Sequence, residues 1–199
     1  MGVWQSWSWS AAVASPYRPW GWHELDPSWA RRLVAEARVV PGAWVLDIGA
    51  GTGALTAPLV DAGARVIAVE AHPGRAEQLR RSFGNTIVVV RADAGDLRLP
   101  RRPFHVVANP PFAITSILLR RLLQPGSRVV TVTLVVQDQV ARRWAAARAP
   151  GAGRWSRQFA VKAGRRVPRS AFWPPPRVST RVLRIERRTG IHRTNARSI

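Results

Sequence analysis

The segment from Val45 to Ala54 constrains the fold of this chain more than any other, and it reads VLDIGAGTGA. A short run suited to a buried strand leads directly into Gly49, Gly51 and Gly53. Glycine lets the backbone approach a ligand closely, and a helix that starts after the turn presents free N–H groups to it. The segment therefore predicts a strand, a ligand-binding turn and a helix, in that order.

The same alternation of strand and helix continues along the chain. Strands are predicted at residues 43–48, 65–69, 86–90, 104–108 and 128–136, and helices at 54–62, 73–83, 114–123 and 138–147. A further helix is predicted over residues 27–39, because Asp26 followed by Pro27 is typical of a helix start. Alternating strands and helices predict a parallel sheet with helices on both faces.

The last third of the chain departs from this alternation. Residues 149–157 are rich in Gly and Arg and are predicted to form a flexible loop. Two strand-like segments, 159–167 and 178–185, have no helix between them, so we expect them to pair antiparallel at the sheet edge. The predicted fold class is therefore α/β: a doubly wound, mostly parallel, seven-stranded Rossmann-like sheet with an antiparallel edge strand. Residues 1–19 are predicted to be a disordered tail, 20–187 the folded domain and 188–199 a basic tail.

Charge is unevenly distributed along the sequence. The chain has 31 basic and 11 acidic residues, a net charge of +20. Residues 141–199 contain 16 basic residues and one acidic residue, Glu186. A GC-rich genome explains why Lys162 is the single lysine, but it does not explain the net charge, because it leaves acidic residues available. A C-terminal segment with one dominant sign, here residues 141–199, predicts a polyanionic partner, which we expect to be a nucleic acid.

Composition also excludes several classes of protein. The chain has no cysteine, so it can form neither a disulfide framework nor a thiolate metal site, and its four histidines lack metal-ligand spacing. The longest apolar run, residues 129–136, is far shorter than the ~20 residues of a membrane helix. The N-terminus lacks the pattern of a secretory signal. We expect a cytoplasmic monomer that holds no metal and does not bind membranes.

The glycine turn fits two classes of cofactor. Gly49, Gly51 and Ala54 satisfy the G-x-G-x-x-A pattern of dinucleotide-binding proteins. Asp47 with Gly49, Gly51 and Gly53 equally satisfies the acidic-x-G-x-G-x-G pattern of S-adenosylmethionine enzymes. The turn alone does not decide between these cofactors.

Two acidic positions follow the next two predicted strands. Glu70 can accept hydrogen bonds from both hydroxyls of a ribose, which either cofactor carries; otherwise it is a solvated acid at a strand end. Asp93, after the third strand, is placed to bind the exocyclic amine of the cofactor's adenine. Asp96 is an alternative, and Asp93 is preferred because it is closer to the strand.

The segment Asn109-Pro110-Pro111-Phe112, directly after the fourth strand, decides for methyl transfer. The lone pair of an aromatic amine is conjugated with its ring, so an enzyme has to orient the amine. The Asn109 side-chain oxygen and the Pro110 carbonyl can accept its two hydrogens, and paired prolines keep these acceptors aimed. Phe112 can stack on a base flipped out of its helix. The alternative is an ordinary proline turn, and adenine N6, cytosine N4 and glutamine amides all remain possible targets.

The order of these motifs resembles that of the ribosomal RNA adenine N6-methyltransferases, a family of S-adenosylmethionine-dependent enzymes. Residues 21–25, GWHEL, are similar to the family's G-Q-N/H-F-L segment, which holds the methionine end of the cofactor. The resemblance implies cofactor contacts at His23 and Leu25, although His23 could also be structural. Trp22 and Glu24 depart from the family's Gln and Phe.

Residues 172–185 are similar to the family's F-x-P-x-P-x-V-x-S-x-V-x-R segment. The resemblance implies that Phe172 covers the other face of the target adenine; the alternative is a core aromatic. The arginine-rich tail and small size favour the Erm macrolide-resistance type, which implies methylation of 23S rRNA in the peptidyl transferase loop and macrolide-lincosamide-streptogramin B resistance. The rival interpretations are a small-subunit rRNA or DNA adenine methyltransferase, and a non-catalytic RNA-binding ribosome-assembly or transcription factor. Because the sequence stops shortly after its last predicted strand, we expect the family's helical C-terminal domain to be mostly missing and methylation to be modest.

Overall fold

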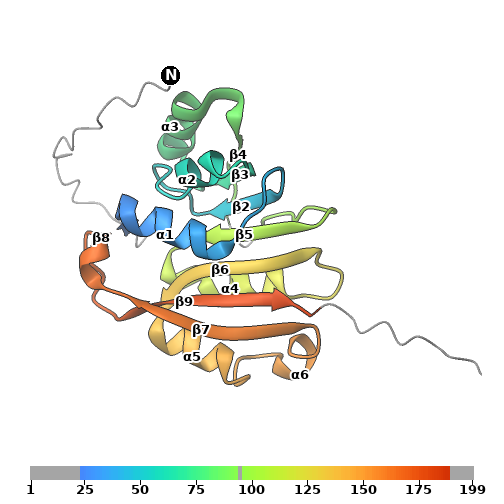
Figure 1. Cartoon of the computed structure of the whole chain (residues 1–199). Coiled ribbons are helices and arrows are strands. Elements are labelled where there is room, and N and C mark those ends of the chain that lie inside the picture. The colour runs from blue at the N-terminus through green and yellow to red at the C-terminus, as the bar shows by residue number, and fades with distance from the viewer. Residues whose placement is uncertain (1–22, 94–95, 189–199) are drawn as a thin grey trace, which may run out of the picture.

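The computed structural model describes residues 23–93 and 96–188 and contains a seven-stranded sheet of order β4-β3-β2-β5-β6-β9-β7 (Figure 1). These strands are β2 (Trp44–Ile48), β3 (Arg65–Val69), β4 (Val88–Val90), β5 (Phe104–Ala108), β6 (Val129–Gln137), β7 (Phe159–Val167) and β9 (Thr180–Arg187). The strands from β4 to β6 run parallel, and β9 runs antiparallel to both β6 and β7. The predicted fold class is confirmed. The antiparallel strand lies one place in from the edge, because β7 is outermost.

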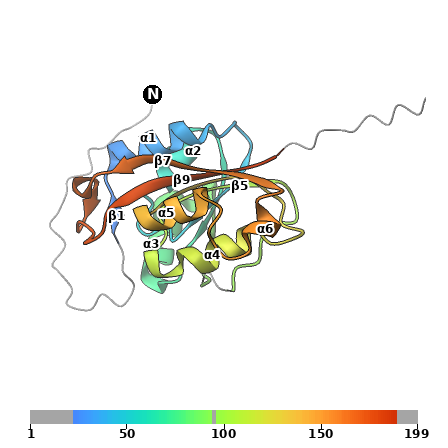
Figure 2. The same cartoon turned by 90° about the horizontal axis from the view of Figure 1, so that it is seen from below.

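Helices cover both faces of the sheet. They are α1 (Pro27–Ala37), α2 (Thr56–Asp61), α3 (Pro73–Phe83), α4 (Thr115–Leu122), α5 (Asp138–Ala145) and α6 (Ala152–Trp155). Buried residues of α1, α2 and α3 belong to one hydrophobic cluster, and those of α4, α5 and α6 to another. Figure 2 shows α1 and α2 on one side of the sheet and α4 and α6 on the other. A position between two apolar layers explains why the central strands β2, β5 and β6 are mostly apolar, whereas β7 and β9 at the sheet edge carry charged residues.

Helix α1 begins where the sequence predicts. The Asp26 carboxylate accepts hydrogen bonds from the N–H groups of Ser28 and Trp29, and Pro27 occupies the first turn. The helix ends at Ala37, two residues before the predicted end, because Arg38 adopts a left-handed conformation with φ of 50°. Its buried residues pack against the sheet, and the segment just before it is held by the Asp26 N–H, which donates to the Ala171 carbonyl at 2.8 Å.

The prediction of a flexible loop at residues 149–157 is wrong. This segment contains α6, and Trp155 is buried against Trp144, with 5.0 Å between ring centroids. The Trp155 indole N–H donates to the Pro150 carbonyl at 3.3 Å. Burial of two large aromatic rings outweighs the flexibility of the neighbouring glycines.

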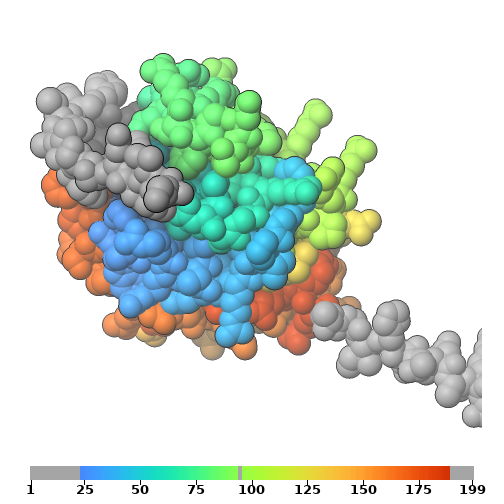
Figure 3. All heavy atoms as spheres, turned by 45° about the horizontal axis from the view of Figure 1, so that its top comes forward, coloured from blue at the N-terminus to red at the C-terminus, as the bar shows by residue number. Residues whose placement is uncertain are grey.

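A two-stranded sheet joins distant parts of the chain and is not predicted from the sequence. Strand β1 (Glu24–Leu25) pairs antiparallel with β8 (Phe172–Trp173), so Glu24 faces Trp173 and Leu25 faces Phe172. In the space-filling view, α1 in blue and the β8 region in orange adjoin at the left of the molecule (Figure 3). This pairing brings both segments of the family resemblance to one place.

Other expectations meet the structure with smaller differences. Strand β4 is shorter than predicted, because a 3-10 turn (Gly84–Thr86) occupies the residues before it. The predicted tails at residues 1–19 and 189–199 lie outside the described residues. Within the described ranges, none of the helices has the length and apolarity that crossing a membrane requires. Over the same residues, His, Asp and Glu form no group of three that could hold a metal ion.

Candidate active site

The glycine turn is tied to the end of β3. The N–H groups of Gly49 and Ala50 donate to the Val69 carbonyl at 2.8 and 3.1 Å. Gly49 has φ of 74°, and a Cβ there would fall 3.0 Å from Cδ of Pro111. At Gly53, where φ is 100°, a Cβ would fall 2.7 Å from the Phe83 ring. The turn therefore requires glycine both for its conformation and for its close contact with the loop after β5.

Glu70 is a buried part of this turn, so the alternative of a solvated acid is wrong. Its side chain is 4% exposed; its Oε2 accepts from the Gly51 N–H at 2.9 Å, and its Oε1 accepts from the His72 N–H at 2.8 Å. The Arg75 guanidinium forms an ion pair with Oε1 at 3.0 Å. The carboxylate links the glycine turn to the start of α3 and leaves further lone pairs on the same oxygens.

Asp93 and its alternative Asp96, the candidates for binding the cofactor's adenine amine, both lie in the loop after β4. Asp93 is exposed, and Asp96 lines a cavity of about 560 Å³ together with Leu46, Ile67 and Val90. The structure thus places Asp96 at a mainly apolar hollow, whereas Asp93 is exposed in the loop just after Ala92, which lines the same hollow.

Asp47 is the most strongly perturbed acid of the site. Its side chain is buried at 1% exposure, and its Oδ2 accepts a hydrogen bond from the Thr56 hydroxyl at 2.7 Å. Burial raises the pKa of Asp47 to about 7, and the neighbouring Glu70 carboxylate adds to the increase. Asp47 lies under the turn, where it holds the first turn of α2.

Asn109 is held in one orientation by the segment before α1. Its side-chain N–H donates to the His23 carbonyl at 2.8 Å, and this contact identifies the amide nitrogen, so Oδ1 is the accepting end. The His23 ring stacks on Phe112, with 5.6 Å between centroids and 28° between planes. His23 Nδ1 lies 2.7 Å from the Pro174 carbonyl, which can only accept, so Nδ1 carries the proton. The structure therefore brings together His23, Asn109 and Phe112 as predicted residues of one site.

Leu25 and Phe172 are buried next to this site, and Leu25 also lines the small cavity beside Asn109. They are 3% and 5% exposed, face each other across β1 and β8, and belong to the cluster that packs against α1. Phe172 therefore packs in the core, as in the alternative interpretation, and its contact with a target base stays a prediction. The next residue, Trp173, is 63% exposed because successive side chains of a strand point to opposite sides.

A small cavity of about 20 Å³ lies between β1, the glycine turn and Asn109. Its lining includes His23, Glu24, Asp47, Gly49, Thr52 and Asn109. The Glu24 carboxylate accepts a hydrogen bond from the Thr52 hydroxyl of the turn. Sequence reasoning did not select Glu24 as a site residue; the signal for it was its departure from the Phe of the resembling segment.

Some arginines of the basic segment 141–199 form contacts within the protein and are not available to a nucleic acid. Arg181 is an ion pair partner of Asp138 at 2.6 Å, and Arg187 donates to the Ser127 and Val129 carbonyls at 2.7 and 2.9 Å. Burial lowers the pKa of Arg187. These two guanidinium groups hold the edge of the sheet together.

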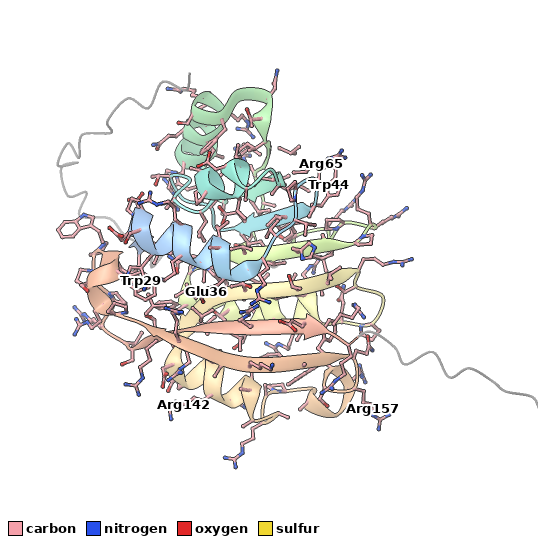
Figure 4. The ribbon with its side chains drawn as sticks, in the orientation of Figure 1. Trp29, Glu36, Trp44, Arg65, Arg142 and Arg157 are labelled. Atoms are coloured by element: carbon pink, nitrogen blue, oxygen red, sulfur yellow. The ribbon has the colours of Figure 1, made fainter. Side chains whose placement is uncertain are left out.

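Several other arginines are exposed. Arg142 extends outward although it pairs with Asp138, and Arg157 projects from the segment after α6 (Figure 4). Arg165 forms an ion pair with Glu36 of α1 at 2.7 Å while its side chain is 49% exposed. These three exposed arginines lie on α5, just before β7 and within β7, so they are spread along the β7 side of the sheet.

Comparison with known proteins identifies close relatives of this arrangement. Residues 23–196 match the family model described as ribosomal RNA adenine dimethylase. The structure superposes on the crystal structure of the 23S rRNA methyltransferase ErmE with a TM-score of 0.72 and 31% identity, covering 82% of this chain and 69% of that chain.

Curated relatives include an rRNA adenine methyltransferase, an antibiotic-resistance protein and a small-subunit rRNA methyltransferase. The rRNA adenine N-6-methyltransferase of Corynebacterium diphtheriae is 38% identical over 146 residues, which cover 72% of this chain and 57% of that protein. The mycinamicin-resistance protein MyrB of Micromonospora griseorubida is 40% identical over 149 residues, covering 73% and 47%. A probable ribosomal RNA small subunit methyltransferase A of Pyrobaculum islandicum is 34% identical over 175 residues, covering 84% and 72%. The chain thus spans about half the length of the first two relatives.

Proposed function

Because the chain belongs to the ribosomal RNA adenine dimethylase family, we propose that it transfers a methyl group from S-adenosylmethionine to N6 of an adenine in ribosomal RNA. The observation that carries this proposal is the Asn109 amide, which the His23 carbonyl holds beside Phe112 and the glycine turn. An acceptor fixed in this way suits an amine that has to be oriented before it reacts.

The residues present fit this cofactor. The positive-φ glycines of the turn let the backbone approach a ligand closely, and Glu70 offers a buried carboxylate for ribose hydroxyls. Asp93 is the proposed partner of the cofactor's adenine amine. When bound, the cofactor supplies an electrophilic methyl group on a sulfonium.

Asn109 and Pro110 orient the target amine for methyl transfer. Asn109 Oδ1 and the Pro110 carbonyl accept the two amine hydrogens, so the nitrogen lone pair leaves conjugation with the ring and points at the methyl group. The bound cofactor would supply the methyl group and retain the electron pair of its S–C bond, and the methylated amine would release its proton to water. A general base is not required, because that amine is strongly acidic.

Phe112 is positioned to hold the base by stacking. Its ring is half-buried and is backed by the His23 ring, which the Pro174 carbonyl holds in turn. A ring fixed on one side presents a firm surface to a base that has left its stack.

The finer proposal is that the target lies in the peptidyl transferase loop of 23S rRNA and that methylation confers macrolide-lincosamide-streptogramin B resistance. The 40% identity to a protein named for mycinamicin resistance and the 31% identity to ErmE support this target. A small-subunit rRNA target is the second candidate, favoured by the 34% identity to a small-subunit methyltransferase over 72% of its length.

Mass-spectrometric mapping of both rRNAs tests the target in a susceptible host that expresses either the intact protein or Asn109→Ala. We expect N6-methyladenine in the 23S peptidyl transferase loop, with raised macrolide and lincosamide tolerance. Asn109→Ala should reduce methylation roughly 100- to 1,000-fold, as the loss of a preorganised transition-state hydrogen bond does. Modification of 16S rRNA alone would select the second candidate. Calorimetry that detects no S-adenosylmethionine binding to the intact protein would favour a non-catalytic RNA-binding role.

The RNA contacts can be located by reversing the charge of exposed arginines near one end or the other of β7. Arg166 and Arg169 lie near the end of β7, next to β8. Arg154 lies in α6 and Arg157 lies just after it, so this second pair is near the start of β7. All four are exposed, so two double Glu variants carry the same change in charge. We expect Arg166→Glu with Arg169→Glu to weaken RNA binding more and to flatten its dependence on salt. Equal effects of the two pairs would contradict RNA contact at the β8 end.

A further inference from the structure

The hollow of about 560 Å³ on the sheet face extends to the edge of the sheet opposite to the proposed active site. Its lining runs from Val90, at the end of β4, to Trp44, the first residue of β2, and Arg102, in the loop before β5. Asn109 and the glycine turn, by contrast, follow the ends of their strands. We propose that the Trp44 end of the hollow binds an unpaired nucleotide of the RNA substrate, separate from the target adenine. This inference rests on the proposed function.

The floor of the hollow is apolar and open. Leu46, Ile67 and Val90 line it from the neighbouring strands β2, β3 and β4. Val88, which pairs with Ile67 in the sheet, is 51% exposed. The described part of the segment between β4 and β5 contains no helix to cover these side chains. A volume of this size lies within the range of roughly 300–1,000 Å³ of pockets that take small molecules, so a flat base fits.

Trp44 holds two cations at the mouth of the hollow. The Cζ atoms of Arg65 and Arg102 lie 5.7 and 4.9 Å from the centroid of its ring. Trp44 and Arg65 are seen at the end of the sheet away from β8 (Figures 1 and 4). The loop that lines the hollow is tied to α4, because Arg121 Nε donates to the Leu97 carbonyl at 2.6 Å. Guanidinium groups held in this way lose little freedom when they bind a phosphate.

Positive charge at this end is not neutralised by ion pairs. The ion pairs between described residues involve none of four exposed arginines, Arg65, Arg98, Arg101 and Arg102. Asp96 is the one acidic residue in the lining of the hollow. By contrast, ion pairs engage arginines of α5, β7 and β9.

An apolar floor beside a local excess of arginine matches the chemistry of a nucleotide. The faces of a base are apolar, and unstacked bases of RNA are held by apolar contacts and by the planes of guanidinium groups. The attached phosphate is an anion that a guanidinium binds with two parallel hydrogen bonds. Because the family acts on ribosomal RNA, the nucleotide that reaches this hollow belongs to the RNA.

Binding of rRNA fragments to the full-length protein tests the proposal with variants that separate charge from shape. The probe is the fragment that the wild type binds most tightly, from a set that covers both 23S and 16S rRNA. Arg98→Glu with Arg102→Glu reverses the charge at the mouth. Ile67→Trp fills the hollow and leaves every arginine in place. Arg154→Glu with Arg157→Glu is the matched control, because these exposed arginines lie near the start of β7, at the other end of the sheet.

We expect Arg98→Glu with Arg102→Glu to weaken RNA binding roughly 10- to 100-fold and to lower the slope of log affinity against log salt by about two. Ile67→Trp should weaken RNA binding by a similar factor, as the loss of one stacked base does, without a change in the salt slope. Both variants should bind S-adenosylmethionine as the wild type does, which also shows that they are folded. The control should lose less RNA affinity than either.

Four results would overturn the inference and leave the proposed function standing. Neither variant changes RNA binding, or the charge reversal alone does so, which would mean contact with phosphates and not with a base. Ile67→Trp weakens S-adenosylmethionine binding, which would assign the hollow to the cofactor. Vesicles of anionic phospholipid bind the wild type more tightly than RNA and lose this affinity on charge reversal, which would identify a lipid surface. A wild-type protein that bound none of the rRNA fragments would overturn the proposed function as well.

Discussion

Asp47 provides a quantitative test of the electrostatics inferred for the site. Replacement by Asn removes the ionisable group but leaves Oδ1 to accept the Thr56 hydrogen bond. Wild-type Asp47 is 1% exposed, and burial raises its pKa from the ordinary 3.8 to about 7. We therefore expect Asp47→Asn to stabilise the fold at alkaline pH.

The magnitude follows from linkage between ionisation and folding. A tenfold change in an acid's dissociation constant corresponds to about 1.4 kcal/mol. The pKa of Asp47 is raised on folding, so the free energy of unfolding is highest below pH 4, where the group is neutral in both states. It falls as the pH rises to about 7, because the unfolded state then favours ionisation. Above pH 7 ionised Asp47 costs the fold about 4 kcal/mol, of which about 3 kcal/mol is lost between pH 5 and pH 8.

Urea unfolding of both proteins at pH 5 and pH 8 measures this loss. The free energy of unfolding of Asp47→Asn minus that of the wild type should grow by about 3 kcal/mol over the interval, because the pH dependence of all other groups cancels in the difference. Asp61→Asn, at an exposed position of α2, is the control and should track the wild type. Parallel profiles for wild type and Asp47→Asn would refute the argument that burial governs this carboxyl group.

Three further predictions test other parts of the structure. Asp93→Ala should reduce S-adenosylmethionine affinity by roughly 1–3 kcal/mol in calorimetry; tight NAD binding by the wild type would contradict this assignment. Phe112→Ala should raise the KM for RNA by the equivalent of roughly 1–3 kcal/mol of stacking while cofactor affinity is retained, and an unchanged KM would remove Phe112 from base capture. Trp155→Ala should destabilise the fold by about 3–5 kcal/mol in urea unfolding, because a buried indole leaves a large cavity; a loss below 1 kcal/mol would mean that α6 packs loosely.

The parts of the site that the sequence predicted share one property. Asp47, Glu70, Asp93 and Asn109 each belong to or follow a strand of the parallel sheet, and such strands end at the same edge. Local patterns that identify the strands therefore also place these side chains together. Parallel topology converts sequence spacing into spatial proximity without any knowledge of tertiary contacts.

The features that the sequence did not predict depend on contacts between distant segments. Strands β1 and β8 are two residues each, too short for a periodic pattern, and their register alone decides that Phe172 is buried and Trp173 is exposed. The Glu24–Thr52 hydrogen bond depends on the same pairing. Helix α6 has a glycine inside it, and it is stabilised by tertiary contacts of Trp155, which packs on Trp144 and donates to the Pro150 carbonyl. Composition likewise could not separate a structural arginine such as Arg187 from an exposed one.

The distribution of charge allows the protein to bind both a negatively charged RNA and a positively charged cofactor. A chain of net charge +20 attracts RNA, but at long range it repels a cofactor that carries an extra positive charge. Screening confines that repulsion to about 8–10 Å, so a few carboxylates close to the cofactor can outweigh many distant arginines. Three of the 11 acidic residues, Glu24, Asp47 and Glu70, lie at the glycine turn. If this separation is correct, added salt should weaken RNA binding steeply and change S-adenosylmethionine binding little.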